Sequence, residues 1–271
     1  MATATIILDK SYLQGTSTDE VETLCRTHRT LVPDVLLMEL FSAPSHTRAV
    51  CLQKLWRRDK GVVFVVNGVG GLFRFELDNR LPCTPIDERF IVSARLSDSL
   101  FDPSCVLTPQ QTRYLDDKET ELRADTLDMI GIWRSVDRFF PRLRGLKPSG
   151  DCEAIDEARR LIASDTTLVR QIYAGICREW KPPNGFTGEI PPANLVGPNW
   201  AVFRWLQVNL LAAVDIVSKY AAVVVSRAEK RTNERHDLDY AVTAALIDGL
   251  ATKDNAMADR FRLLCPSGVL V

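Results

Sequence analysis

The run Thr5-Ile6-Ile7-Leu8-Asp9 decides the fold, because it is short, apolar and ends in an acid. Such a run is typical of a buried strand. A predicted helix over 18–26 and a second strand candidate, Thr30-Leu31-Val32, follow it, and an apolar helix from Val35 to about Ser42 comes after Pro33. Strands that alternate with helices in this way predict a parallel sheet in an α/β fold.

The same alternation returns in the last third of the chain. In chain order, the elements expected there are a long helix over 199–225, a basic turn over 227–235, a helix over 237–247, a strand at 249–252, a helix over 254–264 and a final strand at 269–271. We therefore expect strands from both ends of the chain to share one sheet.

The middle of the chain has a different character. A β-rich run over 61–67, glycines over 68–71 and the run Leu72-Phe73-Arg74-Phe75-Glu76-Leu77 together predict a β-hairpin around a glycine turn. The glycines lack the phosphate-loop pattern G-x-x-x-x-G-K-[ST], and strand-like sequence follows them where a helix should begin. We therefore interpret them as a turn.

Helical sequence covers most of the remaining middle, from about Thr108 to Trp180, and a loop rich in proline and glycine follows it. We therefore expect an α/β core domain made of residues 1–59 and 198–271. Residues 60–197 are expected to form an inserted lobe that holds the hairpin and is otherwise mostly helical.

Composition indicates an ordinary soluble globular protein. Of 271 residues, 46% are hydrophobic and 25% charged, and the formal net charge of −1 gives no global field that draws the molecule to nucleic acid. The seven cysteines form no C-x-x-C pair, which argues against a zinc finger.

The most apolar region, 208–225, is interrupted by Asp215 and Lys219 and so predicts a buried helix rather than a membrane span. Because a signal peptide is also lacking, we expect a cytoplasmic protein with no membrane partner.

Four acids stand out by their positions. Asp9 closes one strand candidate and Asp254 follows another, and ligands in open α/β sheets bind at the carboxyl ends of parallel strands. Glu39 lies in the apolar helix, where a lone carboxylate is costly unless it is paired or metal-bound. Asp237 is expected to open its helix. Four acids around one cleft repel each other unless cations neutralise them, and hard oxygen ligands of this kind suit Mg²⁺ or Mn²⁺.

These segments resemble the PIN-like domain nucleases. The run ending at Asp9 is similar to their first strand and acid, and Leu31-Val-Pro-Asp-Val-Leu-Leu-Met-Glu39-Leu is similar to their second strand and glutamate-bearing helix. The stretch from Asp237 to Asp254 is similar to their late helix, strand and final acid. The block from Pro198 to Gln207 also resembles a helix of bacterial PIN-like proteins that carry inserted helices.

The resemblance implies a three-layer α/β sandwich with a central, mainly parallel sheet and a mostly helical inserted lobe. It implies an endoribonuclease that hydrolyses RNA phosphodiesters with one or two Mg²⁺ or Mn²⁺ ions, as in toxins or defence effectors held in check by an antitoxin or another regulatory protein. A homo-oligomer is a further expected partner state. The catalytic and metal-binding residues it implies are Asp9, Glu39, Asp237 and Asp254. Candidate phosphate contacts are Lys10, Arg204, Arg231, Arg235 and Lys253. Asp239 is a candidate auxiliary acid.

Each acid also has a purely structural interpretation. Asp237 and Asp254 stand where helix N-caps would, Asp9 could bond to backbone in a turn, and a salt bridge to one arginine would satisfy Glu39. The aromatic residues Trp200, Phe203 and Trp205 could stack on bases, although packing in a buried helix is the simpler interpretation. The alternative function is therefore a catalytically inactive PIN-like interaction or regulatory module.

Overall fold

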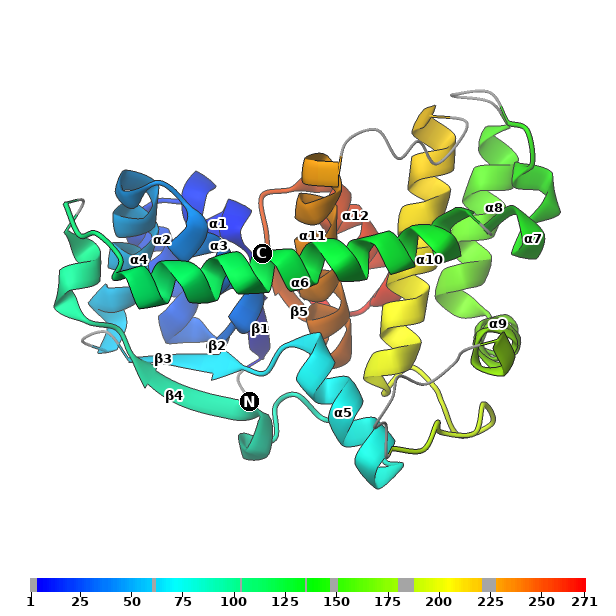
Figure 1. The fold of residues 1–271 in the computed structure, drawn as a ribbon, viewed down its shortest axis with the longest axis horizontal. Coiled ribbons are helices and arrows are strands. Elements are labelled where there is room, and N and C mark those ends of the chain that lie inside the picture. Colours follow the sequence, from blue (N-terminus) through cyan, green and yellow to red (C-terminus); the bar gives the residue numbers. More distant parts are fainter. Residues whose placement is uncertain are drawn as a thin grey trace. The chain divides into compact units, whose positions relative to one another are not determined.

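A six-stranded, mostly parallel sheet organises the computed structural model, which describes residues 4–59, 62–102, 104–134, 136–146, 151–179, 188–220 and 228–271 (Figure 1). The strand order is β4-β3-β2-β1-β5-β6. The strands are β1 (Thr5–Leu8), β2 (Arg29–Pro33), β3 (Val62–Val66), β4 (Ile91–Arg95), β5 (Gly249–Ala251) and β6 (Val269–Leu270). Every neighbouring pair is parallel except β3 and β4, which are antiparallel. The α/β class and the mainly parallel sheet are thus confirmed.

The two ends of the chain meet in the middle of this sheet. β1 pairs with β5, with Ile7 opposite Leu250 and Leu8 opposite Ala251. All five of the residues Ile6, Ile7, Leu8, Leu250 and Ala251 are fully buried, as expected for central strands of a parallel sheet that is covered on both faces. The carboxyl ends of β1 and β5 therefore lie side by side at one edge of the sheet.

The chain divides into two compact units. The first, here called the sheet unit, contains the described residues of Met1–Val69, Thr84–Glu121 and Thr243–Val271. Its helices and turns include α1 (Lys10–Gly15), α2 (Thr18–Thr27), α3 (Asp34–Ser42), α4 (Ser45–Asp59), η1 (Glu88–Phe90), η2 (Asp98–Phe101) and α12 (Asn255–Leu264). Figure 1 shows α1 to α4 grouped together beside the strands.

The second, here called the helical unit, contains the described residues of Gly70–Cys83 and Leu122–Val242. Its elements are most of α5 (Val69–Asn79), the second half of α6 (Pro109–Arg134), α7 (Val136–Phe139), η3 (Pro141–Leu143), α8 (Cys152–Ser164), α9 (Thr166–Glu179), α10 (Ala201–Tyr220) and most of α11 (Ala228–Ile247). Within the described residues one stretch, Ala201–Lys219, is long and apolar enough to cross a membrane, but 78% of it is buried inside the protein. It is therefore the core helix that the sequence predicts.

Buried polar groups on α10 connect it to its neighbours in the helical unit. Gln207 Nε2 donates to the Ile162 carbonyl oxygen at 2.8 Å, and Asn209 Oδ1 accepts from Trp133 Nε1 at 3.2 Å. Trp200 and Phe203 are buried, which confirms the core-packing interpretation of these aromatic residues.

The predicted β-hairpin over 61–77 is wrong from its turn onward. The expected glycine turn already belongs to α5 from Val69, and residues 72–77 continue this helix, so a helix follows where strand-like structure was expected. The strand that pairs antiparallel with β3 is β4, which was not predicted. The buried positions Val69, Leu72 and Glu76 follow helical spacing. The Glu76 carboxylate, only 1% exposed, accepts hydrogen bonds from the backbone N–H groups of Ala201 and Val202, the first residues of α10. This tertiary contact requires a helix that turns Glu76 inward.

The division into units also differs from the predicted domain boundaries. Residues 62–69 and 84–121 belong to the sheet unit, because β3 and β4 extend the sheet. Residues 198–242 belong to the helical unit instead of the core, because α10 packs with α8 and α9. The described part of the predicted basic turn over 227–235 is helical as well, since α11 begins at Ala228, whereas Arg227 lies outside the described residues.

Candidate functional site

Asp9 is the central residue of the candidate site. It follows β1 directly and precedes α1, and its backbone N–H donates to the carbonyl oxygen of Ala251 on β5 at 3.1 Å. Asp9 occupies the N-cap position of α1 but makes no side-chain capping bond there, and it is only 5% exposed. The carboxylate is therefore held in the interior at the edge of the sheet without serving as a helix cap.

Two hydroxyl groups hold the Asp9 carboxylate. Ser11 Oγ donates to Asp9 Oδ2 at 2.5 Å, and Thr252 Oγ1 donates to the same oxygen at 2.6 Å. Each hydroxyl in turn accepts a backbone N–H from the segment after β5: Ser11 Oγ from Lys253 at 2.9 Å and Thr252 Oγ1 from Asp254 at 3.0 Å. These contacts fix the orientation of Asp9 and tie the end of β1 to the end of β5.

Ser11 and Thr252 were not among the residues predicted from the sequence. A hydroxyl carries no charge, so neither residue stood out beside the acids. The signal that identifies them is positional, because Ser11 lies two residues after the acid that ends β1 and Thr252 directly follows β5.

Glu39 lies near Asp9 and contacts a lysine. It projects from α3, and its Oε1 lies 3.4 Å from Lys10 Nζ, with the side chains 12% and 27% exposed. A salt bridge was expected for Glu39, and one is present to Lys10, the neighbour of Asp9 in the chain. Lys10, predicted as a phosphate contact, is positioned by this pair at the rim of the site.

The environment of Asp9 raises the pKa of its carboxyl group above the ordinary value. Burial is the largest cause, and the negative charge of Glu39 adds to it. The hydrogen bonds from Ser11 and Thr252 act in the opposite direction without cancelling the effect of burial. Because this carboxyl group is costly to ionise, a nearby cation would stabilise its charged form and lower its pKa.

Asp254 serves as the N-cap of α12, and this structural interpretation is confirmed. Its Oδ1 accepts the backbone N–H of Met257 at 2.9 Å, and the residue is exposed. Its backbone N–H contacts Thr252 Oγ1, which places it one hydroxyl away from Asp9. A role for Asp254 in metal binding stays a prediction.

Asp237 does not open a helix, contrary to expectation. It lies inside α11, on the part that belongs to the helical unit, and is half-buried. Arg235, predicted as a phosphate contact, is buried there and forms an ion pair with Asp239 one turn away, which gives the candidate auxiliary acid a structural role. The convergence of Asp237 with the acids of the sheet unit stays a prediction.

The other predicted phosphate contacts differ in their surroundings. Arg204 is buried, and its Nε donates to the Pro198 carbonyl oxygen at 2.8 Å, so it acts as a structural residue of the helical unit. Lys253 is exposed, with Nζ 5.2 Å from the centre of the Tyr12 ring, and remains accessible. Arg231 lies in α11, and its side chain is outside the described residues.

The side chains of the candidate site fit a divalent ion only if water and substrate complete its coordination shell. Among the residues that the structure describes, no three His, Cys, Asp or Glu side chains lie close enough together to hold a metal ion. Asp9 and Glu39 nevertheless supply hard carboxylate oxygens, and the charge of Glu39 contributes to the raised pKa of Asp9. Mg²⁺ is commonly held by one or two carboxylates, with water and substrate phosphates completing its shell. The arrangement thus fits such an ion held by two carboxylates, not a preformed cage of four acids.

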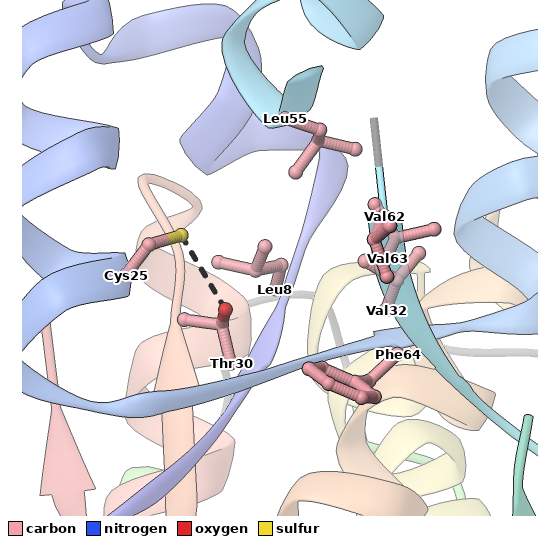
Figure 2. A pocket seen from close by; sticks show the side chains of 8 residues that line it. All are labelled: Leu8, Cys25, Thr30, Val32, Leu55, Val62, Val63 and Phe64. Carbon is pink, nitrogen blue, oxygen red and sulfur yellow. Dashed lines mark hydrogen bonds between the residues drawn. The ribbon is translucent and has the colours of Figure 1, made fainter. Parts of the chain in front are cut away.

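Two other features of the sheet unit do not form a ligand site. A Cβ at Gly68, just before α5, would lie 2.3 Å from Asp34 Oδ2, so the Asp34 carboxylate fills the space beside this glycine. An apolar cavity lies between β1, β2, β3 and α4, and Cys25 Sγ and Thr30 Oγ1 are 3.4 Å apart at its wall (Figure 2). Its volume of about 10 Å³ is enough for one water molecule at most.

Comparison with known proteins identified no relative. No protein family, no curated protein and no solved structure matches this chain.

Proposed function

We propose that this protein is a metal-dependent endoribonuclease of the PIN-like class, with its reaction centre at the carboxyl ends of β1 and β5. The observation that carries the proposal is the burial of the Asp9 carboxylate. The residue is 5% exposed, two hydroxyls hold its carboxylate, and the negative charge of Glu39 contributes to its raised pKa. Buried acids at the edge of a parallel sheet are expensive to maintain and mark functional sites.

The chain's own residues would act mainly by positioning. Ser11 and Thr252 hold Asp9 Oδ2 in one orientation, so the carboxylate needs little reorganisation when a ligand binds. Glu39 supplies the second carboxylate from α3. Lys10 and the exposed Lys253 supply positive charge for the phosphates of the RNA backbone. A bound Mg²⁺ or Mn²⁺ lowers the pKa of a water molecule and stabilises charge on the leaving oxygen.

Cleavage of a labelled single-stranded RNA in the presence of Mn²⁺ tests the proposal. Asp9→Asn and Glu39→Gln should each reduce the rate at least about 100-fold, the loss typical of an electrostatic group in a reaction centre. Asp259→Asn is the matched control, because this carboxylate is 73% exposed on α12 and pairs with the exposed Arg262. Equal cleavage by all three variants would show that the site assignment is wrong.

The same proteins separate cleavage from metal binding. Mn²⁺ should raise the melting temperature of the native chain, since a ligand that binds only the folded state stabilises it. The shift should be much smaller for Asp9→Asn and unchanged for Asp259→Asn.

A catalytically inactive PIN-like interaction module is the second candidate. The contact between Lys10 and Glu39 favours it, because a lysine already neutralises part of the acidic pair. Binding of RNA without cleavage by the native protein, at any Mg²⁺ or Mn²⁺ concentration, would select this alternative.

The proposed activity implies further properties. RNA is the expected substrate, the cytoplasm is the expected compartment, and a toxin or defence effector of this class requires a regulatory partner or a homo-oligomer to restrain it. Expression of the native chain and of Asp9→Asn in separate host cultures tests this expectation, because only the intact site should slow growth of the host cell.

A further inference from the structure

Lys10 has an unusual position within the candidate site. It stands in the chain between Asp9, the buried acid, and Ser11, the hydroxyl that holds it, and its ammonium group extends to Glu39 on α3. A single lysine thus joins the two segments that carry the acidic pair.

The contact between Lys10 and Glu39 is a loose one. Its 3.4 Å distance lies beyond the range of a strong charge-assisted hydrogen bond, and the lysine side chain is 27% exposed. Elsewhere in the chain a structural ion pair looks different: Arg159 donates to Asp215 Oδ1 with two nitrogens, at 3.0 and 2.6 Å. Lysine is a point charge on a flexible stem, so it can leave its partner without disturbing the backbone.

The charges around Lys10 explain why a cation lies there. Asp9 and Glu39 repel each other, and the hydroxyls of Ser11 and Thr252 orient Asp9 but carry no net charge. Lys10 Nζ contacts Glu39 Oε1 and so brings a positive charge to this pair. A divalent ion between the same carboxylates would meet the like charge of the ammonium group and repel it.

We propose that Lys10 is a resident counter-ion of the Asp9–Glu39 pair, which competes with the divalent ion and so sets the metal affinity of the site. The inference rests on the proposed function, because it concerns the same two carboxylates. When the ion binds, Lys10 leaves Glu39, and its flexible stem makes the ammonium group available to a substrate phosphate. Metal binding and phosphate capture are then coupled through one side chain.

Calorimetric titration of the full chain with MnCl₂ tests this proposal without measuring catalysis. Removal of the ammonium group in Lys10→Met keeps the apolar stem and should tighten Mn²⁺ binding about five- to tenfold, the effect expected for a partly exposed charge beside a bound ion. The native chain should also bind Mn²⁺ more weakly than Lys10→Met at every salt concentration, with the difference shrinking as salt screens the ammonium charge.

Arg26→Met is the matched control for the loss of one positive charge. Arg26 lies in the same unit, exposed on α2, where its Nη2 donates to Thr23 Oγ1. Its removal should change Mn²⁺ affinity less than twofold. Melting curves recorded without metal establish that both variants are folded.

The possible outcomes separate the two proposals. Tighter binding by Lys10→Met alone supports the inference, and so does binding by Lys10→Met when the native chain binds nothing measurable. Unchanged or weaker binding by Lys10→Met, with Mn²⁺ still bound by the native chain and lost in Asp9→Asn, overturns the inference and leaves the metal site intact. Absence of Mn²⁺ binding in both the native chain and Lys10→Met overturns the inference together with the proposed nuclease.

Discussion

Replacement of Gly249 by alanine should separate the two strands that build the site. Gly249 begins β5, and a Cβ at this position would lie 2.0 Å from the carbonyl oxygen of Thr5 on β1. Real Cβ contacts do not fall below 3.0 Å and become ordinary at 3.4 Å, so the strands must move apart by 1.0 to 1.4 Å, the differences 3.0 − 2.0 and 3.4 − 2.0. A shift of this size breaks bonds such as the 3.1 Å contact from Asp9 N to Ala251 O.

The cost follows from these displacements. Overpacking in a close-packed interior costs about 1–3 kcal/mol, and two lost ladder hydrogen bonds add about 2 kcal/mol. The lower entropy of the unfolded alanine chain returns about 0.4–1 kcal/mol. We therefore expect Gly249→Ala to lower the free energy of unfolding by about 2–5 kcal/mol, measured by urea denaturation followed by circular dichroism. Mn²⁺ should also stabilise this variant less, because Thr252 moves away from Asp9.

A second glycine provides the control for this experiment. Gly175 lies inside α9, and a Cβ there meets nothing within 4 Å. Gly175→Ala should therefore stabilise the chain by about 1 kcal/mol through helix propensity alone. If Gly249→Ala were to remain within about 0.5 kcal/mol of the native chain, the close approach of β5 to β1 described above would be refuted.

Three further substitutions test other parts of the structure. Asp9→Asn should raise the melting temperature in EDTA at pH 7. Burial raises the pKa of Asp9 in the folded state above its value in the unfolded chain, so ionisation of Asp9 costs stability as the pH rises above the unfolded-state pKa, and the advantage of the variant should shrink toward pH 4. A melting temperature below that of the native chain at both pH values would contradict this. Glu76→Ala should cost about 3 kcal/mol in urea denaturation, because buried N–H groups at the start of α10 lose their acceptor, and a change below 1 kcal/mol would rule out that role. Asp248→Gly should add about 0.5–1 kcal/mol by relieving a φ of 56°, measured in the same way, and a loss of stability would show that the Asp248 side chain matters more than its backbone.

The central strands were predictable because burial leaves a local trace. β1, β2 and β5 are short apolar runs next to acids, prolines or glycines, and the structure contains each of them at the expected place. The adjacency of β1 and β5 could also be expected, since parallel strands in an α/β fold share one sheet. Capping by Asp254 was foreseen for the same reason, because the preference for Asp at an N-cap is local.

Features that depend on distant contacts were not predictable. The run 72–77 alternates like a strand, but it is a helix that buries Val69, Leu72 and Glu76 on one face and brings Glu76 to the start of α10. The edge strand β4 is short and half-exposed, so its sequence carries little apolar signal. Ser11 and Thr252 are ordinary polar residues until β1 and β5 pair and bring them to the same carboxylate oxygen.

The start of α11 could have been found from the sequence. Its first residues, Ala228-Glu-Lys-Arg, are strong helix formers, yet their charge suggested a turn. The error moved Asp237 from the interior of a helix to its first position. The relation of Asp237 to Asp9 and Glu39 depends on tertiary structure and could not be deduced from spacing.

The bond between Asp9 and Thr252 joins residues that are 243 positions apart in the chain. Such a contact closes a very long loop, and non-local pairings of this kind form late in folding. During synthesis, β1 and β2 exist long before β5 leaves the ribosome, so a nascent chain holds Asp9 with the hydroxyl of Ser11 but without that of Thr252. The candidate site is therefore completed only after β5 has been synthesised and has paired with β1.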